Sequence, residues 1–100
     1  MIADATYISL INWTDQGIRN SKQTVERAKA GTELAQRMGG NVTGTYWTVG
    51  PYDIVSIVEF PDDESGTAFL LTLGAQGNIR TTTLRAYTAD EMTGIIQKLG

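Results

Sequence analysis

The sequence contains no cysteine and no histidine. Without cysteine the chain cannot form disulfides, and it lacks thiolate nucleophiles and the thiolate ligands of zinc and iron–sulfur sites. Without histidine it lacks the commonest metal ligand and the side chain that most often acts as a base near neutral pH. Serine-protease-type triads and sites of two histidines and a carboxylate are therefore excluded within this chain. We expect no bound metal and no cofactor.

Long apolar runs and clustered positive charge are also missing. No apolar run approaches the ~20 residues that span a bilayer, and residues 1–4 lack the basic character of a leader segment. The net charge is −3 and the eight basic residues are scattered, which is unlike a nucleic-acid-binding surface. We expect a cytoplasmic protein without membrane or nucleic-acid partners, folded as one domain over residues 1–100.

Residues 49–60 contain a turn followed by the most strongly β-prone segment of the chain. Gly50 and Pro51 favour the turn, because glycine accepts unusual backbone angles and proline fixes φ and has no N–H donor. Residues 54–58 are apolar at nearly every position, whereas a strand with one solvated face alternates. We therefore predict a central strand that is covered on both faces.

Hydrophobic periodicity predicts four strands and three helices. The predicted strands are residues 5–13, 41–49, 52–60 and 79–87. The first helix spans residues 21–38 and packs through Val25, Ala28, Ala35 and Met38; the second begins within residues 61–64 and stops at 74–78, and a short third helix follows residue 88. This is an α+β fold of the ferredoxin-like βαββαβ order with an added C-terminal helix. Right-handed crossovers place both long helices on one face of a four-stranded antiparallel sheet.

The opposite face of this sheet has nothing in the chain to cover it. Nevertheless, apolar or aromatic side chains occur at both odd and even positions in three of the four strands. Large exposed apolar patches are unusual on soluble monomers. We therefore predict that a second copy packs its sheet against the first, forming a homodimer or a higher homo-oligomer.

The fourth strand alternates, so Arg80 and Arg85 point to opposite faces. Leu84 and Ala86 suit the helix side, and we expect the open side to receive Thr81, Thr83 and Arg85. An arginine beneath a partner sheet needs an opposite charge, because a buried unpaired charge is very costly. Two partners fit this requirement: an acid such as Glu59 or Asp53 of a second subunit, or an anionic ligand.

Three separated motifs resemble the GYD domain family. The signature corresponds to Gly50, Tyr52 and Asp53 with Pro51 inserted, and the other two motifs are residues 7–17 (YISLINWTDQG) and 74–86 (GAQGNIRTTTLRA). The resemblance implies a dimeric α/β-barrel type of fold, similar to the ligand-binding domains of Lrp/AsnC regulators and to antibiotic-biosynthesis monooxygenases. It implies no established activity.

Six polar or aromatic residues are candidates for a ligand site. Asn12 and Trp13 end the first strand where Tyr52 and Asp53 begin the third, and antiparallel neighbours bring these pairs to one rim. Arg80 or Arg85 would bind an anion there, so the candidate set is Asn12, Trp13, Tyr52, Asp53, Arg80 and Arg85. In the structural alternative, Asp53 accepts backbone N–H groups of the turn, Tyr52 packs over the sheet edge and Trp13 belongs to the core or an interface.

Two functions fit these observations. The first is a small-ligand-binding or sensor module that acts as a homo-oligomer. The alternative is a cofactor-independent enzyme of the oxygenase or isomerase type, acting on a small organic acid or phenol, and a structural or assembly role is a third option. The missing histidine favours binding, because proton transfer near neutral pH would depend on a shifted Asp, Glu or Tyr.

Overall fold

The computed structural model describes residues 5–100; residues 1–4, noted above for their lack of basic character, lie outside the described residues. The elements in chain order are β1 (Ala5–Trp13), α1 (Asp15–Arg19), the 3-10 turn η1 (Ser21–Gln23), α2 (Thr24–Arg37), β2 (Asn41–Trp47), β3 (Ile54–Phe60), α3 (Asp63–Ala75), β4 (Ile79–Ala86) and α4 (Ala89–Ile96).

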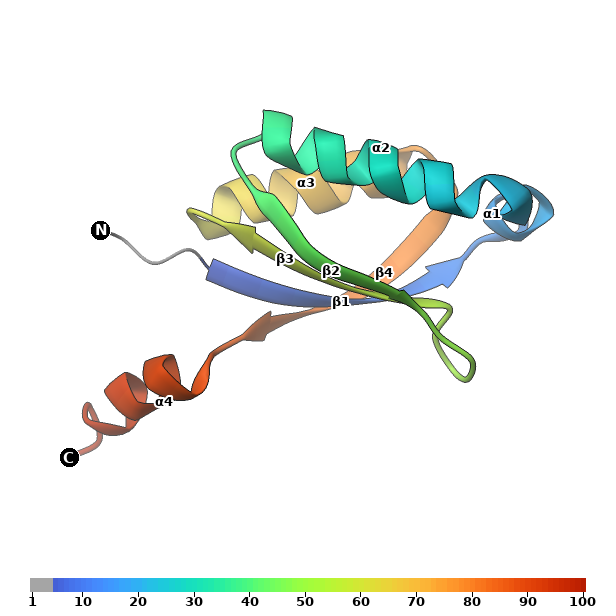
Figure 1. Cartoon of the computed structure of the whole chain (residues 1–100). Helices are drawn as coiled ribbons and strands as arrows, with labels where there is room; N and C mark the ends of the chain where they lie inside the picture. The colour runs from blue at the N-terminus through green and yellow to red at the C-terminus, as the bar shows by residue number, and fades with distance from the viewer. Residues whose placement is uncertain (1–4) are drawn as a thin grey trace.

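The four strands form one antiparallel sheet in the order β2-β3-β1-β4. Helices α2 and α3 cover one face, and α4 projects to the other side of the sheet (Figure 1). The predicted ferredoxin-like order is therefore confirmed, with β1 and β3 as the inner strands. None of the helices in residues 5–100 is long and apolar enough to cross a membrane.

The segment between β1 and α2 is more helical than predicted. A separate helix, α1, begins after Thr14, whose hydroxyl accepts from the Gly17 N–H at 3.1 Å. The packed face of α2 also differs from the prediction, because Val25 is 52% exposed. The other three predicted residues do face the sheet: Ala35 is buried, Met38 packs against the core and Ala28 lines a cavity beneath the helix. Thr24, four residues before Ala28 on the same helix face, takes the place predicted for Val25.

The core lies between the sheet and the two long helices. Its buried side chains come from β1, β3, α2 and α3: Ala5, Tyr7, Ala35, Val58, Phe60 and Phe69. The rings of Phe60 and Phe69 are tilted at 37°, with their centroids 5.2 Å apart. A Cβ on Gly40 would lie 2.4 Å from Phe60 Cε1, so the chain needs glycine where it passes this ring.

The faces of β4 are opposite to our prediction. Arg85 pairs with Tyr7 and Thr83 with Ser9, and both of these β1 residues are buried on the helix-covered face. The Thr83 hydroxyl forms a hydrogen bond with that of Ser9 at 2.9 Å. Thr81, Thr83 and Arg85 therefore lie on the helix side, and Leu84 and Ala86 lie on the open side. The error arose because alternation separates the two faces of a strand without saying which one meets the helices.

Candidate functional site

A cavity of about 90 Å³ lies between the sheet and α2, near the end of β1. All four strands, α2, α3 and the segment that joins α3 to β4 contribute to its wall. The lining residues are Ile11, Trp13, Thr24, Arg27, Ala28, Thr32, Val42, Thr45, Ile54, Ser56, Leu73, Gln76, Asn78 and Ile79.

The strand register explains why these side chains meet. Ile11 of β1 stands opposite Ile54 of β3, and Thr45 of β2 stands opposite Ser56. All four lie on the helix-covered face. Ala28 of α2 closes the space from above, and its small side chain leaves room that a larger residue would fill.

Most polar groups of the cavity wall already form hydrogen bonds within the chain. Ser56 Oγ donates to the Gly44 carbonyl at 3.3 Å. Thr24 Oγ1 accepts from Trp47 Nε1 at 3.0 Å. The Arg27 guanidinium donates to two backbone carbonyl oxygens, those of Asn20 at 2.6 Å and Gly17 at 3.2 Å. The wall therefore offers chiefly apolar contact to an occupant.

Trp13 contributes an aromatic wall to this cavity. Its indole Nε1 is buried and has no acceptor within the described part of the chain. Leaving a buried donor unpaired costs about 1–3 kcal/mol. Because Nε1 has less than 1 Å² of accessible surface, an occupant of the cavity would have to displace its neighbours to reach this group.

The cavity wall offers few groups that could move a proton. Arg27 is the one ionisable side chain among the described residues that line it, and no carboxylate or phenol lies in its wall. A general base would need to be within about 3 Å of the proton that it removes. In the described residues 5–100, no three acidic side chains gather as a metal-binding group either.

Three of the six sequence-predicted residues, Asn12, Trp13 and Asp53, do meet at one rim of the sheet. Asp53 Oδ2 accepts from the Trp13 N–H at 2.9 Å, and the Asp53 N–H donates to the Ile11 carbonyl at 2.9 Å. The Asn12 amide, with its nitrogen toward the turn, donates to the Pro51 carbonyl at 3.0 Å. These contacts extend the pairing of β1 with β3. Asp53 does accept a backbone N–H, but from the end of β1 and not from the turn, as the structural alternative had it.

Tyr52 and the two arginines are placed differently. Tyr52 is half-buried in the turn, where its carbonyl accepts from Thr48 Oγ1 at 2.7 Å. Arg80 pairs with Asn12 at the same rim but on the open face, whereas Arg85 pairs with Tyr7 at the opposite end of β4. The structure therefore does not bring Arg85 together with the other candidates.

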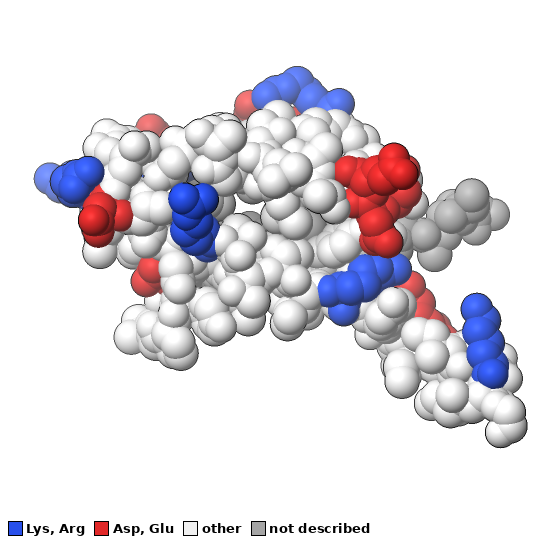
Figure 2. Space-filling view, turned by 180° about the vertical axis from the view of Figure 1, so that it is seen from behind, with Lys and Arg blue, Asp and Glu red and all other residues white. Residues whose placement is uncertain are grey.

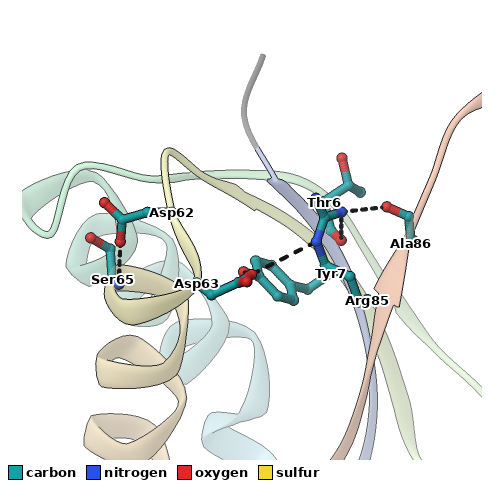
Figure 3. A network of polar contacts seen from close by, with 7 residues as sticks. All are labelled: Thr6, Tyr7, Asp62, Asp63, Ser65, Arg85 and Ala86. Atoms are coloured by element: carbon teal, nitrogen blue, oxygen red, sulfur yellow. Dashed lines mark hydrogen bonds and ion pairs between the residues drawn. The ribbon is translucent and has the colours of Figure 1, made fainter. Parts of the chain in front are cut away.

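Arg85 belongs to a polar cluster that the sequence analysis missed (Figure 3). The Tyr7 hydroxyl donates to Asp63 Oδ1, and Arg85 Nε lies 3.7 Å from the same oxygen. Arg85 Nη1 also donates to the Thr6 and Ala86 carbonyls, at 3.2 and 2.7 Å. The carboxylate partner is thus in the same chain, not Glu59 or Asp53 of a second subunit. The sequence signal was indirect, since only the β1–β4 register places Tyr7 beside Arg85.

Tyr7 is held in its neutral form by this cluster. Burial raises its pKa to about 12, and the hydrogen bond to the Asp63 carboxylate adds to the effect. The ring fits because residue 66 is glycine: a Cβ there would lie 3.0 Å from Tyr7 Cε2. Tyr7 therefore joins β1 to the first turn of α3 as a neutral hydrogen-bond donor.

The face of the molecule drawn in Figure 2 carries few charged groups. Figure 2 shows scattered acidic and basic side chains with uncharged atoms over most of the area between them. In this view, acidic and basic groups meet near the point where the C-terminal segment leaves the body. The ion pair of Asp63 with Arg85 lies near the end of β4. The face seen in Figure 2 carries no continuous basic patch of the kind that nucleic-acid-binding proteins present.

Comparison with known proteins places the fold and the family. The glutamine synthetase and cystathionine beta-lyase binding protein of Thermus thermophilus is 35% identical over 82 residues, which cover 81% of this chain and 86% of that protein. The crystal structure of TTHA0845, also from Thermus thermophilus, superposes with a TM-score of 0.54 and 28% identity, over 85% of this chain and 95% of the other.

A more distant structure shares the fold. MtbAldR (Rv2779c) superposes with a TM-score of 0.65 at 15% identity over 84% of this chain, which spans about half (52%) of the length of MtbAldR. The family model described as "GYD domain" matches residues 7–96 of this chain. This match includes every strand almost completely and agrees with the motifs at residues 7–17, 50–53 and 74–86. The chain belongs to the GYD domain family.

Proposed function

We propose that this protein is a small-ligand-binding module that acts as a homodimer and takes a small, largely apolar molecule into the cavity beneath α2. The observation that carries the proposal is the cavity wall. Its apolar side chains surround a preformed space, and most of its polar groups are already paired. Pockets of this kind hold ligands mainly through apolar burial.

The same wall argues against the enzymatic alternative. An oxygenase or isomerase of this type would need a group to move a proton, yet the described lining residues include no acid and no tyrosine. The neutral Tyr7 points to Asp63 instead. Binding without chemistry is the function that these side chains support.

The open face of the sheet supports the homodimer. Its central side chains are apolar and half-buried in the single chain: Ile8, Leu10, Val55 and Ile57. A second sheet packed on this face would remove them from water, at about 25 cal/mol for each Å² of apolar surface. The cavity lies on the other side of the sheet, so both subunits would keep their ligand sites.

A protein partner is a second candidate, favoured by the name of the Thermus thermophilus relative, which describes binding to two enzymes. We expect this chain to bind a metabolic enzyme through its outer surface. Surface plasmon resonance with purified glutamine synthetase and cystathionine beta-lyase from the same organism would test this. Absence of binding to both enzymes at micromolar concentration would contradict it.

The ligand proposal is tested by filling the cavity. In an Ala28→Leu variant an isobutyl group enters the space beneath α2, and Ala30→Leu places the same group on an exposed position of the same helix. We expect phenol and toluene to bind the unmodified protein with a Kd of about 1 mM or tighter, as measured by tryptophan fluorescence and calorimetry.

The two variants should then diverge. Ala28→Leu should abolish binding and Ala30→Leu should preserve it, while both keep the circular dichroism spectrum of the unmodified protein. Equal binding by both variants, or no binding of either probe to the unmodified protein, would overturn the proposed site.

A further inference from the structure

The C-terminal segment leaves the body as an arm that consists of Tyr87, α4 and the turn after it (Figure 1). Five of the eleven exposed large hydrophobic side chains of residues 5–100 lie between residues 84 and 99: Leu84, Tyr87, Met92, Ile96 and Leu99. The radius of gyration is 14.7 Å, above the ~13 Å typical of a compact chain of this length. The arm therefore exposes apolar surface that the chain itself does not cover.

This helix is built to be ordered. Thr88 and Glu91 form a reciprocal capping box, in which the Glu91 N–H donates to Thr88 Oγ1 at 3.2 Å and the Thr88 N–H to Glu91 Oε1 at 2.9 Å. Met92, Ile95 and Ile96 of α4, and Leu99 in the turn after it, follow the spacing of one helix face. An eight-residue helix is marginal in water without a packing surface.

The base of the arm is held in one direction by Arg85. The guanidinium lies 4.6 Å from the ring centroid of Tyr87 and 5.6 Å from that of Tyr7. It also binds the Ala86 and Thr6 carbonyls and pairs with Asp63 (Figure 3). Arg85 thus ties the first residues of the arm to β1 and α3, so the direction of the arm is part of the fold.

That direction identifies what the arm meets. α4 lies on the side of the sheet opposite α2 and α3, which is the side of the open face (Figure 1). Leu84, on the open face of β4, continues the apolar surface of the sheet toward the arm. Whatever covers the open face therefore also lies alongside α4.

We propose that the arm is a clasp: Met92, Ile95 and Ile96 of α4 and Leu99 of the turn after it pack against a second copy of this chain. The inference rests on the proposed homodimer, in which that copy covers the open face. Two-fold symmetry makes the contact reciprocal, so each subunit is gripped by the arm of the other. The clasp would add apolar area to the interface between the two sheets.

The proposal is tested by placing a negative charge on either side of the arm. Ile96→Glu puts the charge on the apolar face, and Gln97→Glu puts it on the opposite face, next to the same helix end. Sedimentation equilibrium should show that Ile96→Glu raises the dimer dissociation constant at least 10-fold and that Gln97→Glu changes it less than about 3-fold.

The outcomes separate the two proposals. If both variants have the dissociation constant of the unmodified dimer, the clasp is wrong but the sheet-face dimer stands. An unmodified protein that stays monomeric at 100 µM would overturn both.

Cross-linking gives a second measurement that does not depend on stability. Because the chain has no cysteine, Leu99→Cys carries a single attachment point for a benzophenone photo-cross-linker. Irradiation should yield covalent dimers from this variant and none from Lys29→Cys, which is exposed on α2. Equal yields from the two positions would contradict the clasp.

Discussion

The same strands form both faces of the sheet, but α2 and α3 cover only one of them. On β3, Ile54, Ser56, Val58 and Phe60 are buried under the helices, whereas Val55, Ile57 and Glu59 alternate with them and remain half-exposed. Glycine at positions 40 and 66 lets the covered face pack tightly around aromatic rings. On the open face, no part of residues 5–100 covers the apolar side chains of the sheet or of the arm.

In our proposal, this difference separates folding of the single chain from assembly of the homodimer. The covered face contains the core of the single chain, so changes there should act on folding. The open face carries half-exposed apolar side chains. If the proposed homodimer forms there, changes on this face should act on the oligomer. Each prediction below tests one side of this division.

The largest effect is expected from the covered face. Phe60→Ala removes a fully buried ring that packs on Phe69, and we expect it to lower the free energy of unfolding by about 3–5 kcal/mol. Urea unfolding followed by circular dichroism, at one fixed protein concentration, measures this. Leu71→Ala, at a position 70% exposed, should cost less than about 1 kcal/mol. Similar losses for both variants would contradict the assignment of the core.

A lysine on the open face should separate folding from assembly. Ile57→Lys places a charge in the apolar centre of the proposed interface, and we expect at least a 100-fold weaker dimer because burying an unpaired charge is costly. Light scattering over a concentration series measures this, and the circular dichroism spectrum should not change. Thr72→Lys, on the exposed side of α3, is the matched control and should dimerise normally. A fully dimeric Ile57→Lys protein would move the interface elsewhere.

At the rim, the hydrogen bonds of Asp53 extend the pairing of β1 with β3. Asp53→Ala removes the acceptor of the Trp13 N–H, and we expect the free energy of unfolding to fall by about 1–2 kcal/mol. The Asp53→Asn variant keeps a side-chain oxygen and should lose less. Thermal unfolding measures both variants, and each kcal/mol corresponds to about 4–8 °C for a chain of this size. If Asn destabilises as much as Ala, the carboxylate acts through its charge rather than as an acceptor.

The smallest effect is the pH dependence that Tyr7, on the covered face, gives to the free energy of unfolding. A tyrosine in the unfolded chain loses its proton near pH 10, whereas Tyr7 in the folded chain does so near its raised pKa of about 12. The neutral form is thus favoured by folding, and its contribution is complete below pH 10 and lost between pH 10 and 12. By pH 10.5 we expect a loss of under about 1 kcal/mol, measured as a falling urea midpoint. Tyr7→Phe should lack this part of the decline; an identical decline in both proteins would contradict the raised pKa.

Local chemistry was sufficient to predict most of the architecture. The β-branched runs, the glycine and proline at residues 50–51 and the cap residues Thr88 and Glu91 act over a few positions, and the structure confirms the strands and helices that they predict. The meeting of Asn12 and Trp13 with the turn before β3 also followed from sequence, because antiparallel order alone brings these segments to one rim.

Only the tertiary structure decided which side of each element meets which neighbour. The alternation of β4 is equally compatible with either orientation, and the register that sets Arg85 opposite Tyr7 resolves it through contacts between residues 78 positions apart. The cavity likewise depends on how far α2 stands from the sheet above Ile11 and Ile54. Such distances are set by packing between whole elements, whereas local pattern constrains only the elements themselves.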